Sequence, residues 1–185
     1  MNLAAAFFIA VVIGLVAGRQ RMLARAIPQR HAEPFDGVVY RVGSAHVAER
    51  RCAPDPEATV ICMHGYLEDM RYFTHFYADP SIQLIVLNSA DYHLPVENAQ
   101  LRDADWACAP QAEEGSVEYD AEVLVQALAA LPKSRNLRVH GHSRGGAVVL
   151  EAASRRPDLF ERVEVVLEAP VLPQAKAKAP VTAFG

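Results

Sequence analysis

A serine with glycines two positions before and two positions after it is the clearest candidate for chemistry in this chain. It lies in the run Leu137-Arg138-Val139-His140-Gly141-His142-Ser143-Arg144-Gly145-Gly146, which begins as an apolar strand and leads into a helix-like segment at 147–153. A serine on such an abrupt strand-to-helix turn takes a strained backbone conformation, and the residues two positions away crowd it. Gly141 and Gly145 relieve that crowding. The pattern predicts a nucleophile elbow that presents the Ser143 hydroxyl at the carboxyl end of a sheet.

A serine that attacks a carbonyl carbon needs hydrogen-bond donors for the oxyanion that develops. The backbone N–H of Arg144 is one candidate, because it lies at the positive end of the helix that follows the serine. A second motif, His64-Gly65-Tyr66, directly follows an apolar strand-like segment at 59–63. The separation of the two motifs leaves room for one strand and one helix between them.

Together the two motifs resemble the α/β-hydrolase family, and the resemblance covers residues 38–170. In that family a His-Gly after the third strand marks the loop with the other oxyanion donor. The resemblance implies that this donor is the backbone N–H of Tyr66, with His64 and Gly65 supporting the loop. It also implies a serine hydrolase of the esterase or lipase kind, which acts on a small-molecule ester or acyl substrate through Ser143 and needs no cofactor.

The resemblance further implies an acid and then a histidine base after the serine in chain order. Glu168 ends the strand-like segment at 162–168 and is the first candidate for the acid. No histidine follows His142, so the base is missing from this sequence. The resemblance therefore implies a chain truncated after that strand, without the last two strands of the family. We expect weak hydrolysis or none from such a chain.

Other histidines are alternatives for the base. His142 is adjacent to the nucleophile, but adjacent side chains on a tight turn diverge, and His140 points off the strand before the turn. His64 lies in a loop that faces the elbow, and His93 follows a predicted strand. A metal site made of His64, His140 and His142 lacks a carboxylate ligand and an open coordination position, so no metal is expected.

The segments around these motifs alternate between strand and helix patterns. The predicted strands include a hairpin at 38–42 and 45–50, then 59–63, 82–87 and 162–168, and the predicted helices are 67–77, 117–131 and 147–153. Such alternation indicates parallel strands joined by right-handed crossovers. The predicted fold class is α/β, with an α/β-hydrolase-type, mostly parallel sheet that has helices on both faces.

An uncharged apolar run at 3–18 precedes this domain and is close to the lower length limit for a membrane span. A cleaved signal peptide is one interpretation, although no positive side chain precedes the run. Arginines follow it, at positions 19, 21, 25 and 30. The positive-inside rule therefore favours a retained transmembrane helix in contact with lipid, with a cytoplasmic domain at an inner or plasma membrane.

The predicted organisation has four parts. They are a transmembrane anchor at 3–18, a basic juxtamembrane linker at 19–36, the α/β-hydrolase core at 37–170 and a disordered tail at 171–185.

Composition excludes some classes of function. The formal net charge is -4, and no Lys/Arg stripe interleaved with aromatic residues is present, so we expect no nucleic-acid partner. Cys52, Cys62 and Cys108 are widely spaced and are predicted to be reduced thiols. Three functions remain: a serine hydrolase, a ligand-binding module without turnover, and an interaction protein that pairs a partner with the strand at 163–167.

Overall fold

The computed structural model describes residues 3–24, 31–90, 92–97 and 99–172. The chain divides into two units, Met1–His31 and Ala32–Gly185, each described by itself below. Residues 25–30 of the predicted linker and 173–185 of the predicted tail lie outside the described residues, so the predictions for those segments are not tested. The predicted boundary between linker and core likewise stays a prediction.

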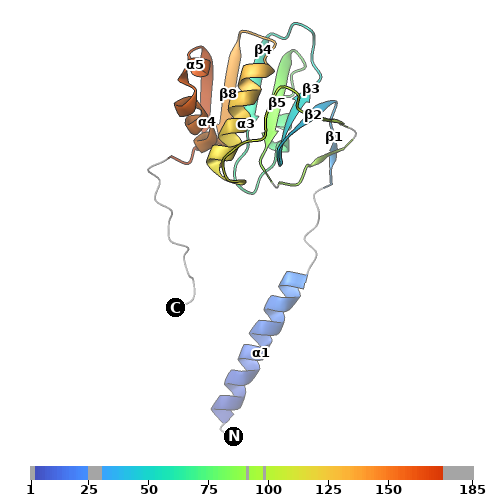
Figure 1. Ribbon diagram of the computed structural model, residues 1–185. Coiled ribbons are helices and arrows are strands. Elements are labelled where there is room, and N and C mark those ends of the chain that lie inside the picture. The colour runs from blue at the N-terminus through green and yellow to red at the C-terminus, as the bar shows by residue number, and fades with distance from the viewer. Residues whose placement is uncertain (1–2, 25–30, 91, 98, 173–185) are drawn as a thin grey trace. The chain divides into compact units, whose positions relative to one another are not determined.

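The first unit contains the helix α1, Leu3–Ala24 (Figure 1). A membrane span needs about 20 consecutive apolar residues, and the uncharged run ends at Arg19, with Arg21 one turn from the end of the helix. In the part of the chain that the structure describes, no helix has both the length and the apolar character to cross a bilayer. The predicted transmembrane anchor at 3–18 and the predicted single-pass membrane location are wrong by this finding.

The second unit is built on a mixed sheet whose described strands follow the order β7-β2-β3-β5-β4-β8-β9. The pairs β2–β3 and β3–β5 are antiparallel and the other neighbours are parallel. The strands are β2 Gly37–Val42, β3 Ala45–Arg50, β4 Ala58–Met63, β5 Ile82–Asn88, β7 Gln100–Asp103, β8 Leu137–His142 and β9 Val163–Glu168. Two short segments, β1 Glu33–Pro34 and β6 Val96–Glu97, pair separately.

Helices cover both faces of this sheet, as predicted. The helices α3 Val117–Ala130, α4 Arg144–Arg155 and α5 Pro157–Phe160 lie on one face (Figure 1), and α2 Arg71–Phe76 packs against the other. Side chains alternate along each strand, so Ile61 and Met63 of β4 join the core under α3 and α4. Val60 and Cys62 join the core under α2.

Of two predicted helices, the structure confirms the start of one and shortens the other. The N-cap of α3 is confirmed, because the Ser116 hydroxyl accepts from the Tyr119 N–H at 3.0 Å. The helix expected at 67–77 is shorter, since α2 begins only at Arg71. Leu67 has φ of 63°, and side chains at 68 and 69 bond to nearby backbone N–H groups instead of continuing a helix.

The carboxyl ends of the central parallel strands meet at one edge of the sheet. Met63 of β4 pairs with Leu87 of β5 on one side and with Gly141 of β8 on the other, and Gly141 pairs with Leu167 of β9. The loops after β4, β5, β8 and β9 therefore converge, and ligands of open α/β sheets bind at such an edge.

Candidate active site

The turn at Ser143 has the strained geometry of a nucleophile elbow. Ser143 has φ of 51° and ψ of −116°, and it lies directly between β8 and α4. A Cβ on Gly145 would collide with the backbone of Met63 and His64, and a Cβ on Gly141 would lie 2.5 Å from the Gly145 carbonyl oxygen. Both positions therefore require glycine because other backbone atoms occupy the space of a side chain.

Backbone hydrogen bonds tie the elbow to the end of β9. The Ser143 N–H donates to the Glu168 carbonyl at 2.9 Å. The Ser143 carbonyl accepts from the N–H groups of Gly146 and Val171, each at 3.0 Å. The Arg144 N–H, at the first position of α4, belongs to the helix-start donors that have no intrahelical acceptor.

The loop after β4 lies against the elbow. A Cβ on Gly65 would be 3.1 Å from Cβ of Ser143 and 3.0 Å from Nδ1 of His142. Tyr66, the next residue, is 68% exposed. The structure thus brings the loop of the predicted second oxyanion donor next to the predicted nucleophile.

His64 is buried and uses both ring nitrogens. Its Nε2 accepts the Ser89 N–H at 3.1 Å, so the ring proton lies on Nδ1, which donates to the Gly65 carbonyl at 2.8 Å. Burial lowers the pKa of His64 and so favours this neutral form. Since Nε2 is occupied, His64 has no ring nitrogen available to accept a proton from Ser143, which argues against the alternative of His64 as base.

His142 turns toward α2. Its ring stacks on Tyr72, with centroids 4.8 Å apart and an interplanar angle of 18°. Its Nδ1 lies 2.7 Å from Oε2 of Glu68, and the same carboxylate oxygen accepts the Gly65 N–H at 3.1 Å. Among the hydrogen bonds of the described residues, none joins a histidine ring to the Ser143 hydroxyl.

His140 lies on the same face of β8, two residues earlier, and is 3% exposed. Aromatic rings of Phe73, Phe76 and Tyr77 surround it, and the Tyr77 hydroxyl lies 2.8 Å from its Nδ1. Burial lowers the pKa of His140, so its neutral form is favoured. This histidine is part of the packing beneath α2 and does not reach the elbow turn.

Glu168, the predicted acid, ends β9 with its carboxylate on the α2 side. Oε1 accepts the Tyr72 hydroxyl at 2.7 Å, and this hydrogen bond raises the pKa of Tyr72 to about 12. Oε2 lies 3.4 Å from Nε2 of His140, but the two atoms make no hydrogen bond. The Glu168 carboxylate therefore has an imidazole nearby, though a buried one, and its role as a triad acid stays a prediction.

The side chain of Arg144 makes a buried network that the sequence did not indicate. Its Nη1 donates to Oδ2 of Asp120 at 2.6 Å and to Oγ of Ser89 at 3.0 Å, and the Ser89 hydroxyl also bonds to Asp120. Its Nη2 donates to the carbonyls of Gly115 and Ser116, each at 2.9 Å. These bonds hold the start of α4 against the start of α3.

One signal could have identified Asp120. It lies three residues after Val117 and four before Leu124, so helical spacing puts its carboxylate on the apolar stripe of α3. A carboxylate on a buried face needs a cationic or hydrogen-bonding partner. Nothing in the sequence spacing indicates that the partner is Arg144.

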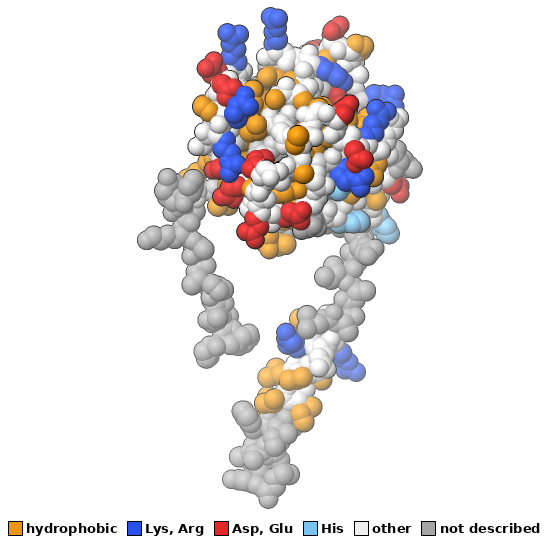
Figure 2. All heavy atoms as spheres, in the orientation of Figure 1, with side chains coloured by type: hydrophobic (Ala, Val, Ile, Leu, Met, Phe, Trp, Pro, Cys, Tyr) orange, Lys and Arg blue, Asp and Glu red, His pale blue; other side chains and the backbone are white. Residues whose placement is uncertain are grey.

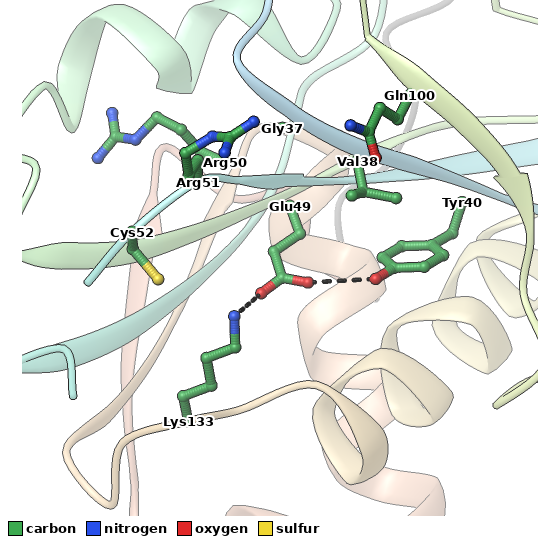
Figure 3. A pocket seen from close by; sticks show the side chains of 9 residues that line it. All are labelled: Gly37, Val38, Tyr40, Glu49, Arg50, Arg51, Cys52, Gln100 and Lys133. Atoms are coloured by element: carbon green, nitrogen blue, oxygen red, sulfur yellow. Dashed lines mark hydrogen bonds and ion pairs between the residues drawn. The ribbon is translucent and has the colours of Figure 1, made fainter. Parts of the chain in front are cut away.

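Within the described ranges, no three His, Cys, Asp or Glu side chains lie close enough together to hold a metal ion. A cavity of about 310 Å³ lies at the other end of the strands, where Lys133 and Tyr40 both contact the Glu49 carboxylate (Figure 3). Glu49 is near the end of β3, which runs antiparallel to β5, so this cavity is remote from the carboxyl ends where Ser143 lies.

No family model matches the sequence, and no curated protein matches it. Solved structures do match. A haloalkane dehalogenase, DatA from Agrobacterium tumefaciens C58, is 22% identical with a TM-score of 0.50, over 74% of this chain and 42% of that one. AqDC, which recognises and cleaves the ring of the Pseudomonas quinolone signal, is 15% identical with a TM-score of 0.52, over 75% and 48%. A thioesterase domain from the curacin biosynthetic pathway is 18% identical with a TM-score of 0.50, over 78% and 50%.

The second unit therefore has the α/β-hydrolase fold that the two motifs predicted. At these sequence identities the likeness shows the fold alone. The chain spans half or less of the length of each of these three proteins.

Proposed function

We propose that this chain is a serine hydrolase, or the nucleophile-bearing part of one, that acts on an ester or related acyl substrate. Ser143 is the nucleophile, and the backbone N–H groups of Tyr66 and Arg144 are the oxyanion donors. The observation that supports the proposal most is the closeness of Gly65 to the strained Ser143: a Cβ at position 65 would lie 3.1 Å from Cβ of Ser143, at the carboxyl edge of the sheet.

Activity of the chain by itself is proposed to be weak. A serine hydroxyl needs a base to take its proton, and loss of the base from a triad costs several powers of ten in rate. The histidines nearest the elbow are engaged elsewhere: His64 with Ser89 and Gly65, and His142 with Glu68. Glu168 remains the proposed acid for a histidine that this sequence does not contain.

A fluorophosphonate probe tests the proposal, because it forms a covalent bond only with an activated serine. We expect slow labelling of the wild-type chain, located at Ser143 by peptide mass spectrometry, and loss of that label in Ser143→Ala. The variant should keep the wild-type melting curve, because the change removes one oxygen from a half-buried turn. Equal labelling of Ser143→Ala would refute the assignment, as would equal hydrolysis of a p-nitrophenyl ester.

The two other functions stay predictions. Binding of an acyl ligand without any labelling of Ser143 would favour a ligand-binding module. The interaction hypothesis has one observation in its favour: β9 forms an edge of the sheet among the described strands, and Val165 in that strand is 41% exposed. On the face drawn in Figure 2, acidic and basic side chains are interspersed, and the absence of a nucleic-acid partner stays a prediction.

A further inference from the structure

The oxyanion loop depends on the orientation of a single peptide unit. The Gly65 carbonyl and the Tyr66 N–H belong to one planar trans peptide, so they point in opposite directions. His64 Nδ1 donates to this carbonyl at 2.8 Å. That bond fixes the carbonyl on one side and, through the rigid plane, aims the Tyr66 N–H to the other.

The preceding peptide unit is held in the same way by a second side chain. Oε2 of Glu68 accepts the Gly65 N–H at 3.1 Å. Glycine has the greatest backbone freedom of any residue, so without these two bonds both peptide planes at Gly65 would rotate easily. A Cβ at position 65 would lie 2.7 Å from this carboxylate oxygen and 3.1 Å from Cβ of Ser143, so a side chain there would displace the Glu68 carboxylate.

Glu68 is bonded directly to a residue that flanks the nucleophile, and His64 is connected to the other flanking residue through Ser89. Glu68 Oε2 bonds to Nδ1 of His142, the residue before Ser143. His64 accepts from the backbone of Ser89, whose hydroxyl accepts from the guanidinium of Arg144, the residue after Ser143. Hydrogen bonds thus connect the loop to the residue before Ser143 and, through Ser89, to the residue after it.

We propose that Glu68 is a positioning residue that pre-forms the oxyanion hole together with His64, whose support of this loop the resemblance already implied: the two side chains fix the two peptide planes at Gly65 so that the Tyr66 N–H faces the carbonyl attacked by Ser143. This inference rests on the proposed function. Neither residue touches the substrate: each acts through the Gly65–Tyr66 backbone.

The experiment measures the rate of Ser143 labelling by a fluorophosphonate, which needs no turnover and suits a weak enzyme. Glu68→Ala removes the acceptor of the Gly65 N–H, and His64→Leu removes the donor to the Gly65 carbonyl. We expect each to slow labelling about tenfold to a hundredfold, somewhat less than complete removal of an oxyanion donor costs. Glu114→Ala, an exposed acidic residue outside these contacts, is the control and should label at the wild-type rate.

Rescue by conservative variants separates positioning from a general structural effect. Glu68→Gln keeps an oxygen that can accept both hydrogen bonds, and His64→Asn keeps an N–H at the position of Nδ1. Both should label within about threefold of wild type. Glu68 lies near the surface, so Glu68→Ala keeps the test decisive if His64→Leu does not fold.

The outcomes distinguish this inference from the proposed function. Wild-type labelling at Ser143 with unchanged rates in Glu68→Ala and in folded His64→Leu would overturn the positioning roles and leave the hydrolase proposal standing. Slow labelling in the conservative variants, equal to that in Glu68→Ala and His64→Leu, would also overturn them. No labelling of the wild-type chain would overturn both.

Discussion

The elbow at Ser143 and the loop that begins at His64 lie in contact, yet different forces hold them. The elbow is set by backbone packing: Gly141 and Gly145 fit only because they have no side chain. The loop is set by side-chain hydrogen bonds to residues distant in sequence, such as the bond from Ser89 to His64. The comparison teaches that steric exclusion at glycines can set one half of a candidate site while side-chain hydrogen bonds set the other half.

Gly145→Val should have the largest effect and tests the packing half of this comparison. A side chain at this position meets the carbonyl groups of Met63 and His64, which cannot move without disturbing β4. We expect a loss of about 3 kcal/mol or more in the free energy of unfolding, measured by urea denaturation. Gly115→Ala is the matched control: it meets no atom within 4 Å and only strains a φ of 78°, so it should cost about 1 kcal/mol. Equal losses in the two variants would contradict a packing origin.

Asp120→Ala should come next, because it removes a buried carboxylate that bonds both to Arg144 and to Ser89, the residue whose N–H bonds to His64 of the loop. The change leaves the Arg144 guanidinium without its carboxylate partner, although two carbonyl partners remain. We expect a loss of about 2 kcal/mol in the free energy of unfolding, below the range for a fully buried pair. Asp120→Asn keeps an acceptor oxygen and should lose less. A wild-type urea midpoint in Asp120→Ala would show that the network adds no stability.

Lowering the pH should reduce the free energy of unfolding through the buried histidines, one of which, His64, holds the loop. Burial lowers the pKa of His64, with Asp120 and Asp69 opposing this shift and Arg144 adding to it, and burial also lowers the pKa of His140. Below the ordinary histidine pKa of 6.5, these two imidazoles bind protons in the unfolded chain but stay neutral in the folded chain. The free energy of unfolding therefore falls as the pH drops below 6.5. The fall ends once the pH passes the lowered folded values.

Urea midpoints measured from about pH 7.5 to pH 5 check this direction. His64→Asn removes one of the buried imidazoles and should flatten the pH dependence between these limits. A variant with the same slope as wild type would show that His64 does not contribute.

Glu168→Gln should have the smallest effect, and it tests whether Glu168 acts on a base within this chain. The Glu168 carboxylate bonds to Tyr72 and faces a buried histidine, so in this chain it orients no free imidazole. We expect the weak rate of p-nitrophenyl ester hydrolysis to change less than about threefold. A loss of a hundredfold would show that Glu168 acts on a base within the chain. In a chain extended by a downstream histidine, the same substitution should cost much more.

The sequence predicted the regular elements where pattern and local chemistry agree. The hairpin of β2 and β3, the buried strands β4 and β5, and the N-cap at Ser116 all appear as predicted. It missed β7, because Gln100–Asp103 is exposed along its whole length and carries no alternating apolar pattern. It extended α2 too far, because the aromatic spacing gave no sign of the side-chain bonds made by Glu68. It also predicted a membrane anchor that the described helix does not support.

What the sequence by itself determined is the strand-to-helix turn at Ser143 and the alternation of strands and helices along the chain around it. Steric exclusion at Gly141 comes from Gly145 and Gly146, so it is encoded locally, whereas at Gly145 it comes from Met63 and His64, which the sheet brings there. Only the tertiary structure decided that Arg144 bonds to Asp120 and that His64 bonds to Ser89. Those contacts join residues 24 and 25 positions apart, and their partners are chosen by strand register and helix packing rather than by spacing in the chain.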